Sequence, residues 1–167
     1  MIILAVDPGI RGCGAAVFQA ERLLAAEYVR NPCIAGSIPD AILDMARAVV
    51  VWFWSVGLQA PDALVIEWPQ IYRAGKMKGD QNDLLPLVGV DLAIAAKLNV
   101  QTIAYRPAEW KGQMTKDATQ ARVTARLDRV ETNRIRHAGA KDHNTYDAIG
   151  IGLHHIGRFQ PTRVFAR

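Results

Sequence analysis

Three acidic residues stand where a carboxylate could do chemistry. Asp7 ends the apolar run 1–6, and Glu67 ends a second short apolar run, 63–66. Runs of this length are typical of buried strands, and a charge at their ends is costly to bury unless a cation compensates it. Asp147 lies in the first turn of the last predicted helix. The three are candidate metal ligands, although Asp7 alone could equally cap the Asp-Pro-Gly turn that follows it.

Two further polar residues precede Asp147 at helical spacing. Asn144 lies three residues before it and His143 four residues before it, so both can share its face of the helix. Asn144 offers a neutral oxygen ligand or the helix N-cap. His143 could act as a ligand or as a general acid–base near neutral pH. Either residue could also do no more than begin the helix.

Clustered carboxylates repel one another unless hard cations lie between them. Mg²⁺ prefers oxygen ligands and keeps water molecules, which leaves room for a substrate phosphate. Two such ions about 4 Å apart can activate a water molecule and stabilise the leaving oxygen in phosphodiester cleavage. The residue types therefore predict this chemistry, provided that the fold brings the three acids together.

Positive charge is concentrated in one part of the chain. The net charge is +4, and residues 104–141 hold nine basic and four acidic side chains. We expect one helix from Thr115 or Asp117 to about 130, in which Val123, Leu127 and Val130 face the core. Arg122, Arg126 and Arg129 have the same spacing and would form a basic ridge. Such a ridge could track phosphates or could be the solvated side of the helix.

The composition indicates one globular domain. The chain of 167 residues is half apolar, and its longest apolar run, 48–58, is too short for a membrane span and predicts a buried helix end. The first residues lack the basic lead of a signal peptide, so we expect a cytoplasmic protein without a membrane partner. Cys13 and Cys33 form no metal or redox motif.

Further elements follow from apolar patterns and from Pro and Gly breaks. We expect strands at 11–18, 23–30 and 100–105, helices from Ser37 or Asp40 to 55 and at 84–98, a helical turn at 107–111, a basic connector at 131–141, and a last helix at 144–156. Asp83 is the expected cap of the helix 84–98, whose second apolar face could form a dimer interface or be covered by the same chain. Gly150 and Gly152 in the last helix predict close backbone packing against the sheet.

Four stretches together resemble a known family. They are ILAVDPGIRGCGAAVF, ALVIEWPQIY, YRPAEWKGQMTKDATQARV and HNTYDAIGIG. In this order and spacing, and over almost the whole chain, they resemble the RuvC family of Holliday junction resolvases, within the RNase H-like nucleases. The resemblance implies an α/β, RNase H-like fold with a five-stranded mixed sheet, three strands antiparallel and two parallel, flanked by helices. We expect one such domain over 1–160 and a basic tail at 161–167.

The resemblance also implies an activity. It is that of a homodimeric endodeoxyribonuclease, acting in DNA recombination and repair, that nicks two opposing strands of a four-way DNA junction. The cofactor would be Mg²⁺ or Mn²⁺, with two ions per active site.

Carried over by position, Asp7, Glu67 and Asp147 would be the catalytic metal-binding carboxylates. Lys111 and Lys116 match basic positions that contact DNA or the scissile phosphate. The family usually has a fourth acid, or a His, three residues before the last Asp. Here that position holds Asn144, and His143 could replace the missing group as ligand or acid–base.

The polar stretch 72–81 follows Glu67 closely and could reach into a junction. Trp68, Tyr72 or Met77 could stack on bases, or Trp68 could be a core residue beside a solvated loop. The expected DNA contacts of this loop and of the Arg ridge are Tyr72, Arg73, Lys76, Lys78, Arg122 and Arg126.

Other functions remain as alternatives. An RNase H-like nuclease could cut other branched DNA or RNA–DNA hybrids, and Asn144 allows a junction-binding protein with weak catalysis. The turn DPGIRGCG also resembles an actin-like phosphate loop, but those ATPases need a second loop and two lobes.

Overall fold

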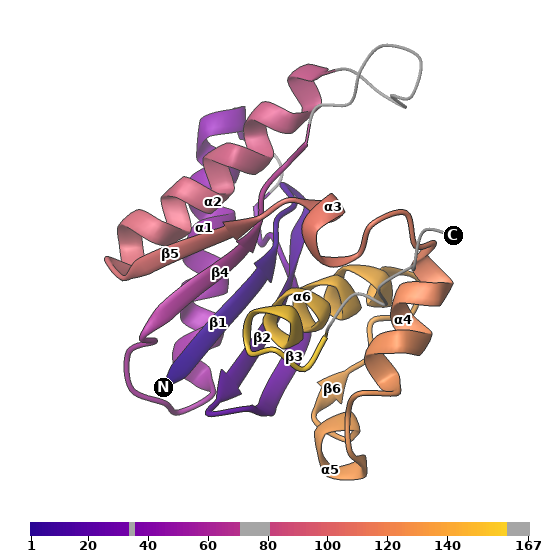
Figure 1. Cartoon of the computed structure of the whole chain (residues 1–167). Helices are drawn as coiled ribbons and strands as arrows, with labels where there is room; N and C mark the ends of the chain where they lie inside the picture. The colour runs from indigo at the N-terminus through magenta and orange to yellow at the C-terminus, as the bar shows by residue number, and fades with distance from the viewer. Residues whose placement is uncertain (34–35, 71–80, 160–167) are drawn as a thin grey trace.

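A computed structural model describes residues 1–33, 36–70 and 81–159, which fold around one mixed sheet (Figure 1). Its strands are β1 (Ile2–Asp7), β2 (Gly12–Gln19), β3 (Arg22–Arg30), β4 (Ala63–Glu67), β5 (Gln101–Tyr105) and β6 (Ile135–Arg136). They lie in the order β5-β4-β1-β2-β3-β6. Strands β1, β2 and β3 pair antiparallel, whereas β4 and β5 continue parallel to β1.

The predicted α/β sheet of three antiparallel and two parallel strands is therefore confirmed, but the strand number was wrong. A sixth strand, β6, pairs parallel with β3 inside the segment expected to be a connector. Two residues are too few to show the alternation of apolar and polar side chains by which a strand is recognised.

Strand direction sets where the functional groups can meet. Strands β1, β3, β4, β5 and β6 all point the same way, so their carboxyl ends lie along one edge of the sheet. Asp7 and Glu67 are the last residues of the neighbouring strands β1 and β4, and Val6 pairs with Ile66 just before them. The sheet register alone brings these two acids side by side.

Helices cover both faces of the sheet (Figure 1). Helices α1 (Ile38–Ser55) and α2 (Leu85–Leu98) pack on one face, and α6 (Asp142–His155) crosses the other, with α4 (Lys116–Thr124) against it. Alternate β1 residues enter the two cores: Ile3 and Ala5 face α6, while Leu4 and Val6 face α1 and α2. By the same alternation Asp7 points to the α6 side.

Helix α1 begins as expected, with Ser37 as N-cap in a capping box with Asp40. Two other expectations for this layer were wrong. A 3₁₀ turn, η1 (Gln81–Leu84), precedes α2, so Asp83 does not cap it, and the N-cap position falls on Leu84. The end of α1 is not fully buried either, since Val51 is 62% and Trp54 is 47% exposed.

The predicted helix from Thr115 to about 130 is two helices. Thr115 caps α4, which ends at Thr124, and Asp128 caps a second short helix, α5 (Arg129–Thr132), in a capping box with Glu131. Val123 is buried as expected, but Val130 is 51% exposed. The three arginines 122, 126 and 129 therefore do not form one helical ridge. The local cap at Asp128 overrides the apolar spacing that suggested a continuous helix.

Helix α6 starts two residues earlier than predicted. Its N-cap position is Lys141, so Asn144 lies inside the first turn and is not the N-cap. Gly150 and Gly152 confirm the expected close packing: a Cβ on Gly152 would collide with the ring of Phe18 on β2, and a Cβ on Gly150 with the ring of Trp110. Trp110 ends α3 (Pro107–Trp110), the expected single helical turn.

Among the described helices, none has the length and apolar character that crossing a membrane requires.

A third close approach joins β2 to α6, and it yields a test. A Cβ on Gly14 would collide with the backbone carbonyl of Asn144. Gly14→Ala should therefore push β2 and α6 apart and lower the free energy of unfolding by about 1–3 kcal/mol, measured by chemical denaturation.

Gly89→Ala is the matched control for this variant. Its Cβ would lie 2.7 Å from Cδ1 of Ile42, a terminal methyl that can move, and Ala favours the helix. We expect this variant to be neutral or stabilising. Equal stability losses in the two variants would show that the Gly14 contact has no special role.

Candidate active site

Three carboxylates converge at the carboxyl edge of the sheet. Asp7 comes from the end of β1, Glu67 from the end of β4 and Asp147 from α6, and ligand oxygens of all three lie within 4.8 Å of one another. Residues from three distant parts of the sequence thus form one cluster. All three are partly exposed, so the cluster can be reached from solvent.

Backbone contacts position Asp147 relative to Asp7. Gly14 is the strand partner of Asp7 across β1 and β2, and the carbonyl of Asn144 rests on Gly14. Asp147 follows Asn144 by three residues and so lies on the same side of α6. The close approach of α6 to Gly14 therefore fixes the third carboxylate opposite the first.

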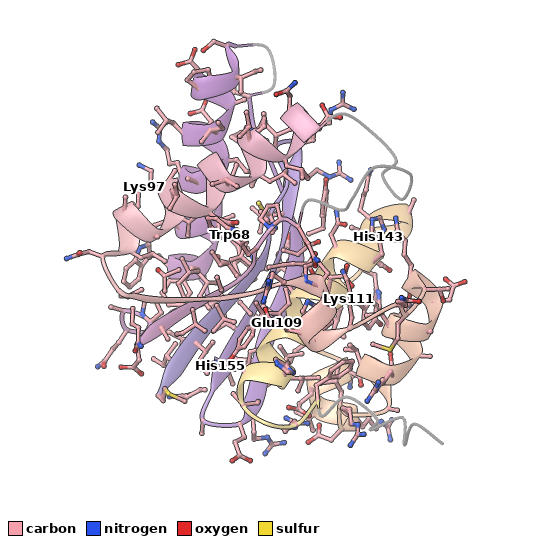
Figure 2. The ribbon with its side chains drawn as sticks, turned by 45° about the horizontal axis from the view of Figure 1, so that its top comes forward. Trp68, Lys97, Glu109, Lys111, His143 and His155 are labelled. Atoms are coloured by element: carbon pink, nitrogen blue, oxygen red, sulfur yellow. The ribbon has the colours of Figure 1, made fainter. Side chains whose placement is uncertain are left out.

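Lys111, directly after α3, supplies the cation of the cluster (Figure 2). Its Nζ lies 2.7 Å from Oδ2 of Asp147 and 3.0 Å from Oε2 of Glu67. Only 17% of the Lys111 side chain is exposed. These two ion pairs use two of the three N–H groups of the ammonium.

Trp110 orients Glu67 and was not singled out from the sequence. Its Nε1–H donates a hydrogen bond of 2.8 Å to Oε2 of Glu67, and its ring is buried against Gly150 of α6. The Nζ of Lys111 lies 4.8 Å from the centre of the same ring. One helical turn therefore carries both groups that hold Glu67. The one feature of the sequence that pointed to Trp110 was its position next to Lys111, a predicted DNA contact.

In the absence of bound cations, burial and mutual repulsion disfavour the ionised form of the carboxyl groups of Asp7 and Glu67. Burial raises the pKa of Asp7 well above its usual value, and Glu67 and Asp147 raise it further. Burial also raises the pKa of Glu67, against the opposing effect of Lys111. Burial lowers the pKa of Lys111, but Glu67 and Asp147 outweigh this and raise it overall. The two acids are thus shifted first by burial and then by neighbouring charge, whereas the rise for Lys111 comes from the negative charge around it.

The donor set suits a hard divalent cation. Three carboxylates provide oxygen ligands only, which Mg²⁺ and Mn²⁺ prefer, and with one ammonium they leave an excess of negative charge when ionised. Asp7, Glu67 and Asp147 could therefore hold a metal ion.

Comparison with known proteins identifies solved structures that share this fold. No family model matches the sequence, and no curated protein matches it. Among solved structures, RuvC of T. thermophilus in complex with a Holliday junction substrate matches with a TM-score of 0.65 and 23% identity, over 93% of this chain and 92% of that one. The chain has the fold of the RuvC Holliday junction resolvases.

Two further structures agree with the RuvC fold. A second structure of T. thermophilus RuvC has a TM-score of 0.60 and 21% identity, over 96% of this chain and 99% of the other. The yeast mitochondrial Holliday junction resolvase Ydc2 has a TM-score of 0.52 and 9% identity, over 94% and 79%. The RNase H-like architecture expected from the sequence motifs is thereby confirmed.

Within this RuvC fold, His143 and Asn144 lie in the first turn of α6 (Figure 2 labels His143). The Nδ1 of His143 lies 3.2 Å from the carbonyl oxygen of Ala140. Among the described residues, the acid and histidine cluster that could share an ion comprises Asp7, Glu67 and Asp147, without His143. Which of His143 and Asn144 completes the site stays a prediction.

The basic residues expected to contact DNA are dispersed. Lys116 is exposed in the first turn of α4, and Arg126 is exposed after that helix ends. Arg122 lies 4.8 Å from the ring centre of Phe159, so part of its role is packing. The loop residues Tyr72, Arg73, Lys76, Met77 and Lys78 lie outside the described residues.

Asp91 is a second group that the sequence argument missed. It lies fully buried on α2, and within the described residues neither carboxylate oxygen has a hydrogen-bond partner. Burial and the nearby charge of Glu67 raise its pKa from the usual 3.8 to about 8. The signal was present in the sequence, because Asp91 is the lone acid inside the apolar helix 84–98.

Lys111 should matter most for stability when metal is absent. In EDTA at pH 8, Lys111→Met leaves the buried carboxylates without their cation and should lower the free energy of unfolding by about 3–5 kcal/mol. The loss should be smaller at pH 5, because the raised pKa values of Asp7 and Glu67 mean that lowering the pH protonates them sooner than ordinary acids. Chemical denaturation at the two pH values measures both effects.

Lys97→Met is the matched control. Lys97 is exposed in the last turn of α2, away from Lys111 in Figure 2. We expect little change in stability. A loss as large as that of Lys111→Met would contradict a specific role for the Lys111 ion pairs.

Asp91 should make stability depend on pH. Because its pKa is raised in the folded state, the native protein holds a proton that the unfolded chain releases between about pH 4 and about pH 8. The stabilisation is complete below this window and is lost as pH rises through it, at a slope of up to about 1.4 kcal/mol per pH unit. In EDTA, Asp91→Asn should remove this slope, so the variant gains on the wild type between pH 5 and pH 8.

Asp117→Asn, an exposed acid on α4, serves as the control. Its stability difference from the wild type should not change over this window. Parallel stability curves for Asp91→Asn and the wild type would show that Asp91 is ionised throughout.

Proposed function

We propose that the protein is a metal-dependent endodeoxyribonuclease that resolves four-way DNA junctions by paired nicks in opposing strands. The observation that carries the proposal is the convergence of Asp7, Glu67 and Asp147 at the strand ends of a RuvC fold. Support comes from a structural neighbour, T. thermophilus RuvC, whose structure is described as a complex with a Holliday junction substrate.

The proposed chemistry is hydrolysis of a phosphodiester. Bound Mg²⁺ or Mn²⁺, as two ions per site, would activate a water molecule and stabilise the leaving oxygen. Asp7 is the proposed shared ligand, and Glu67 and Asp147 complete the set. Trp110 holds the Glu67 carboxylate in place through its N–H, and His143 or Asn144 supplies the remaining group.

Lysines provide the proposed contacts to the reacting phosphate. The ammonium of Lys111 already lies between Glu67 and Asp147, which is where a phosphate would meet the carboxylates. Lys116 is exposed at the start of α4, which packs on α6. Both can offset the charge of a phosphate that approaches three acids.

A homodimer fits this activity, since two copies would supply two sites for opposing strands. Helices α1 and α2 pack against each other and carry exposed large apolar side chains. These are Ile38, Leu43, Val51, Trp54, Leu85 and Leu92. An exposed apolar surface of this kind is typical of a protein–protein interface.

Asp7→Asn tests the proposal. Mutating a residue that only hydrogen-bonds to a metal ligand typically lowers activity about 10- to 100-fold. Removing the proposed shared ligand itself should therefore slow junction cleavage in Mg²⁺ by at least about 100-fold. Binding of the junction should persist, because the basic residues are unchanged. Cleavage of a labelled synthetic junction and its gel retardation measure the two properties.

Glu21→Gln, which removes an exposed acid at the opposite end of the sheet, should cleave like the wild type. Symmetric paired nicks by the wild type support resolution of junctions. Cleavage of only flaps or RNA–DNA hybrids would instead identify another RNase H-like nuclease. Tight junction binding without any cleavage would leave a junction-binding protein.

A further inference from the structure

The carboxyl edge of the sheet carries a second group of functional side chains, on the far side of β1 from Glu67. Strand β3 ends at Arg30 and β6 ends at Arg136, followed by His137, and both strands run parallel to β1. The same edge therefore presents acids at the ends of β1 and β4 and cations at the ends of β3 and β6.

A cavity of about 360 Å³ opens between these cations. This is many times the roughly 30 Å³ that a water molecule occupies in the liquid, and it is large enough for a phosphate group with bound water. Its lining residues include three basic side chains, one acid and one phenol: Glu27, Tyr28, Arg30, Arg136, His137 and Ala138.

Tyr28 connects this cavity to the carboxylate cluster. Its ring packs on Gly12, the first residue of β2, so closely that a Cβ there would lie 2.5 Å from the phenol oxygen. Burial raises the pKa of this phenol, Cys13 and Asp7 add to the rise, and Arg30 and Arg11 oppose it. Across the sheet, Tyr28 pairs with Gly14 and Gly14 pairs with Asp7, so Tyr28 lies level with Asp7, two strands away.

The cationic side chains of the cavity have N–H groups that are not used by ion pairs with the described part of this chain. Oε2 of Glu27 accepts a hydrogen bond from Nε1 of Trp52 and lies 3.4 Å from Nη1 of Arg136. The Arg136 side chain is nevertheless 80% exposed, so its other N–H groups face solvent. Nδ1 of His137 lies 3.0 Å from Oδ2 of Asp142, which directs Nε2 elsewhere. Arg30 is exposed and, within the described residues, has no ion pair.

The negative charge of the carboxylate cluster is a reason for a nucleic-acid strand to need cations close to it. A nucleic-acid strand that brings a phosphate to three carboxylates meets repulsion there, and neighbouring phosphates of the same strand need cations close by. Several other arginines are already engaged with acids, Arg22 with Asp128, Arg106 with Glu109 and Arg158 with Glu131.

We propose that Tyr28, Arg30 and Arg136 form a second phosphate-binding subsite, which holds a phosphodiester of the cleaved strand beside the one at the carboxylates. Tyr28 donates a hydrogen bond from its hydroxyl, and the two guanidinium groups supply the charge. His137 lies at the rim of the same cavity. The subsite rests on the proposed nuclease function, but it is tested by binding alone.

The experiment measures the affinity of the full chain for a fluorescent four-way junction in EDTA, over a series of salt concentrations. Each phosphate contact that is lost lowers the salt slope by about one. Raising the salt from 50 to 200 mM weakens binding by a certain factor in the wild type. For Arg30→Ala and for Arg136→Ala, this factor should be about threefold smaller. Both variants should also bind more weakly than the wild type at the lowest salt concentration.

Tyr28→Phe separates the hydroxyl from the ring, which stays packed on Gly12. It should bind about two- to tenfold more weakly with an unchanged salt slope, because a hydrogen bond is lost and no charge is removed. Thermal unfolding of each variant checks that the fold is intact.

Arg22→Ala is the matched control, since Arg22 begins β3 at the opposite end of the same strand. It should bind with the wild-type salt slope. Equal slope losses in Arg22→Ala and Arg30→Ala would indicate diffuse surface charge and overturn the subsite. Wild-type binding by Arg30→Ala, Arg136→Ala and Tyr28→Phe would overturn the subsite while leaving the nuclease proposal intact. A wild-type protein that binds no junction would instead defeat both proposals.

Discussion

Mutual repulsion among three partly buried carboxylates is the constraint on which the site depends. Asp7 and Glu67 are forced together by the register of β1 and β4, and α6 adds Asp147. The fold meets this cost with one ammonium, that of Lys111, and one indole N–H, that of Trp110. Both come from a single helical turn between β5 and α4, so the placement of that turn decides whether the cluster is tolerated.

Lys111 also makes folding separable from metal binding. Small proteins that depend on a structural metal unfold without it, because the ligands are held together by the ion alone. Here the carboxylates already have a partner in the same chain, and the surrounding core is continuous on both faces of the sheet. A bound cation would enter a site that already exists, and it would compete with Lys111 for the same oxygens.

The parts of the site that lie on regular elements could be predicted from the sequence. Buried strands end at Asp7 and Glu67, and parallel strands bring their carboxyl ends to one edge, so two carboxylates followed from local patterns alone. The last helix supplied Asp147, although this residue lies in the second turn and not in the first, because α6 begins at Asp142. The family resemblance implied three antiparallel and two parallel strands, but a two-residue strand such as β6 has no pattern of its own.

What could not be predicted depends on contacts between distant residues. The sequence marks Lys111 as basic, but only the position of α3 shows that it lies inside the cluster, paired with Glu67 and Asp147. The contact of Tyr28 with Gly12 likewise joins residues of different strands. Asp91 differs, because an acid inside an apolar helix is visible in the sequence, and the packing of α2 adds only how deeply it is buried. The break before α5 was different: the pair Asp128 and Glu131 is a capping box that the sequence displays.

The two glycines of α6 set the rotation of the helix about its own axis. The rings of Trp110 and Phe18 fit only where Gly150 and Gly152 leave the backbone bare. Since each residue turns a helix by about 100°, a slip of one position would swing Asp147 away from its neighbours. A residue inserted between Asp147 and Gly150 would therefore abolish the site without disturbing any strand. The same insertion after Gly152 would leave the carboxylate where it is, so the tolerance of this helix to insertions changes sharply within one turn.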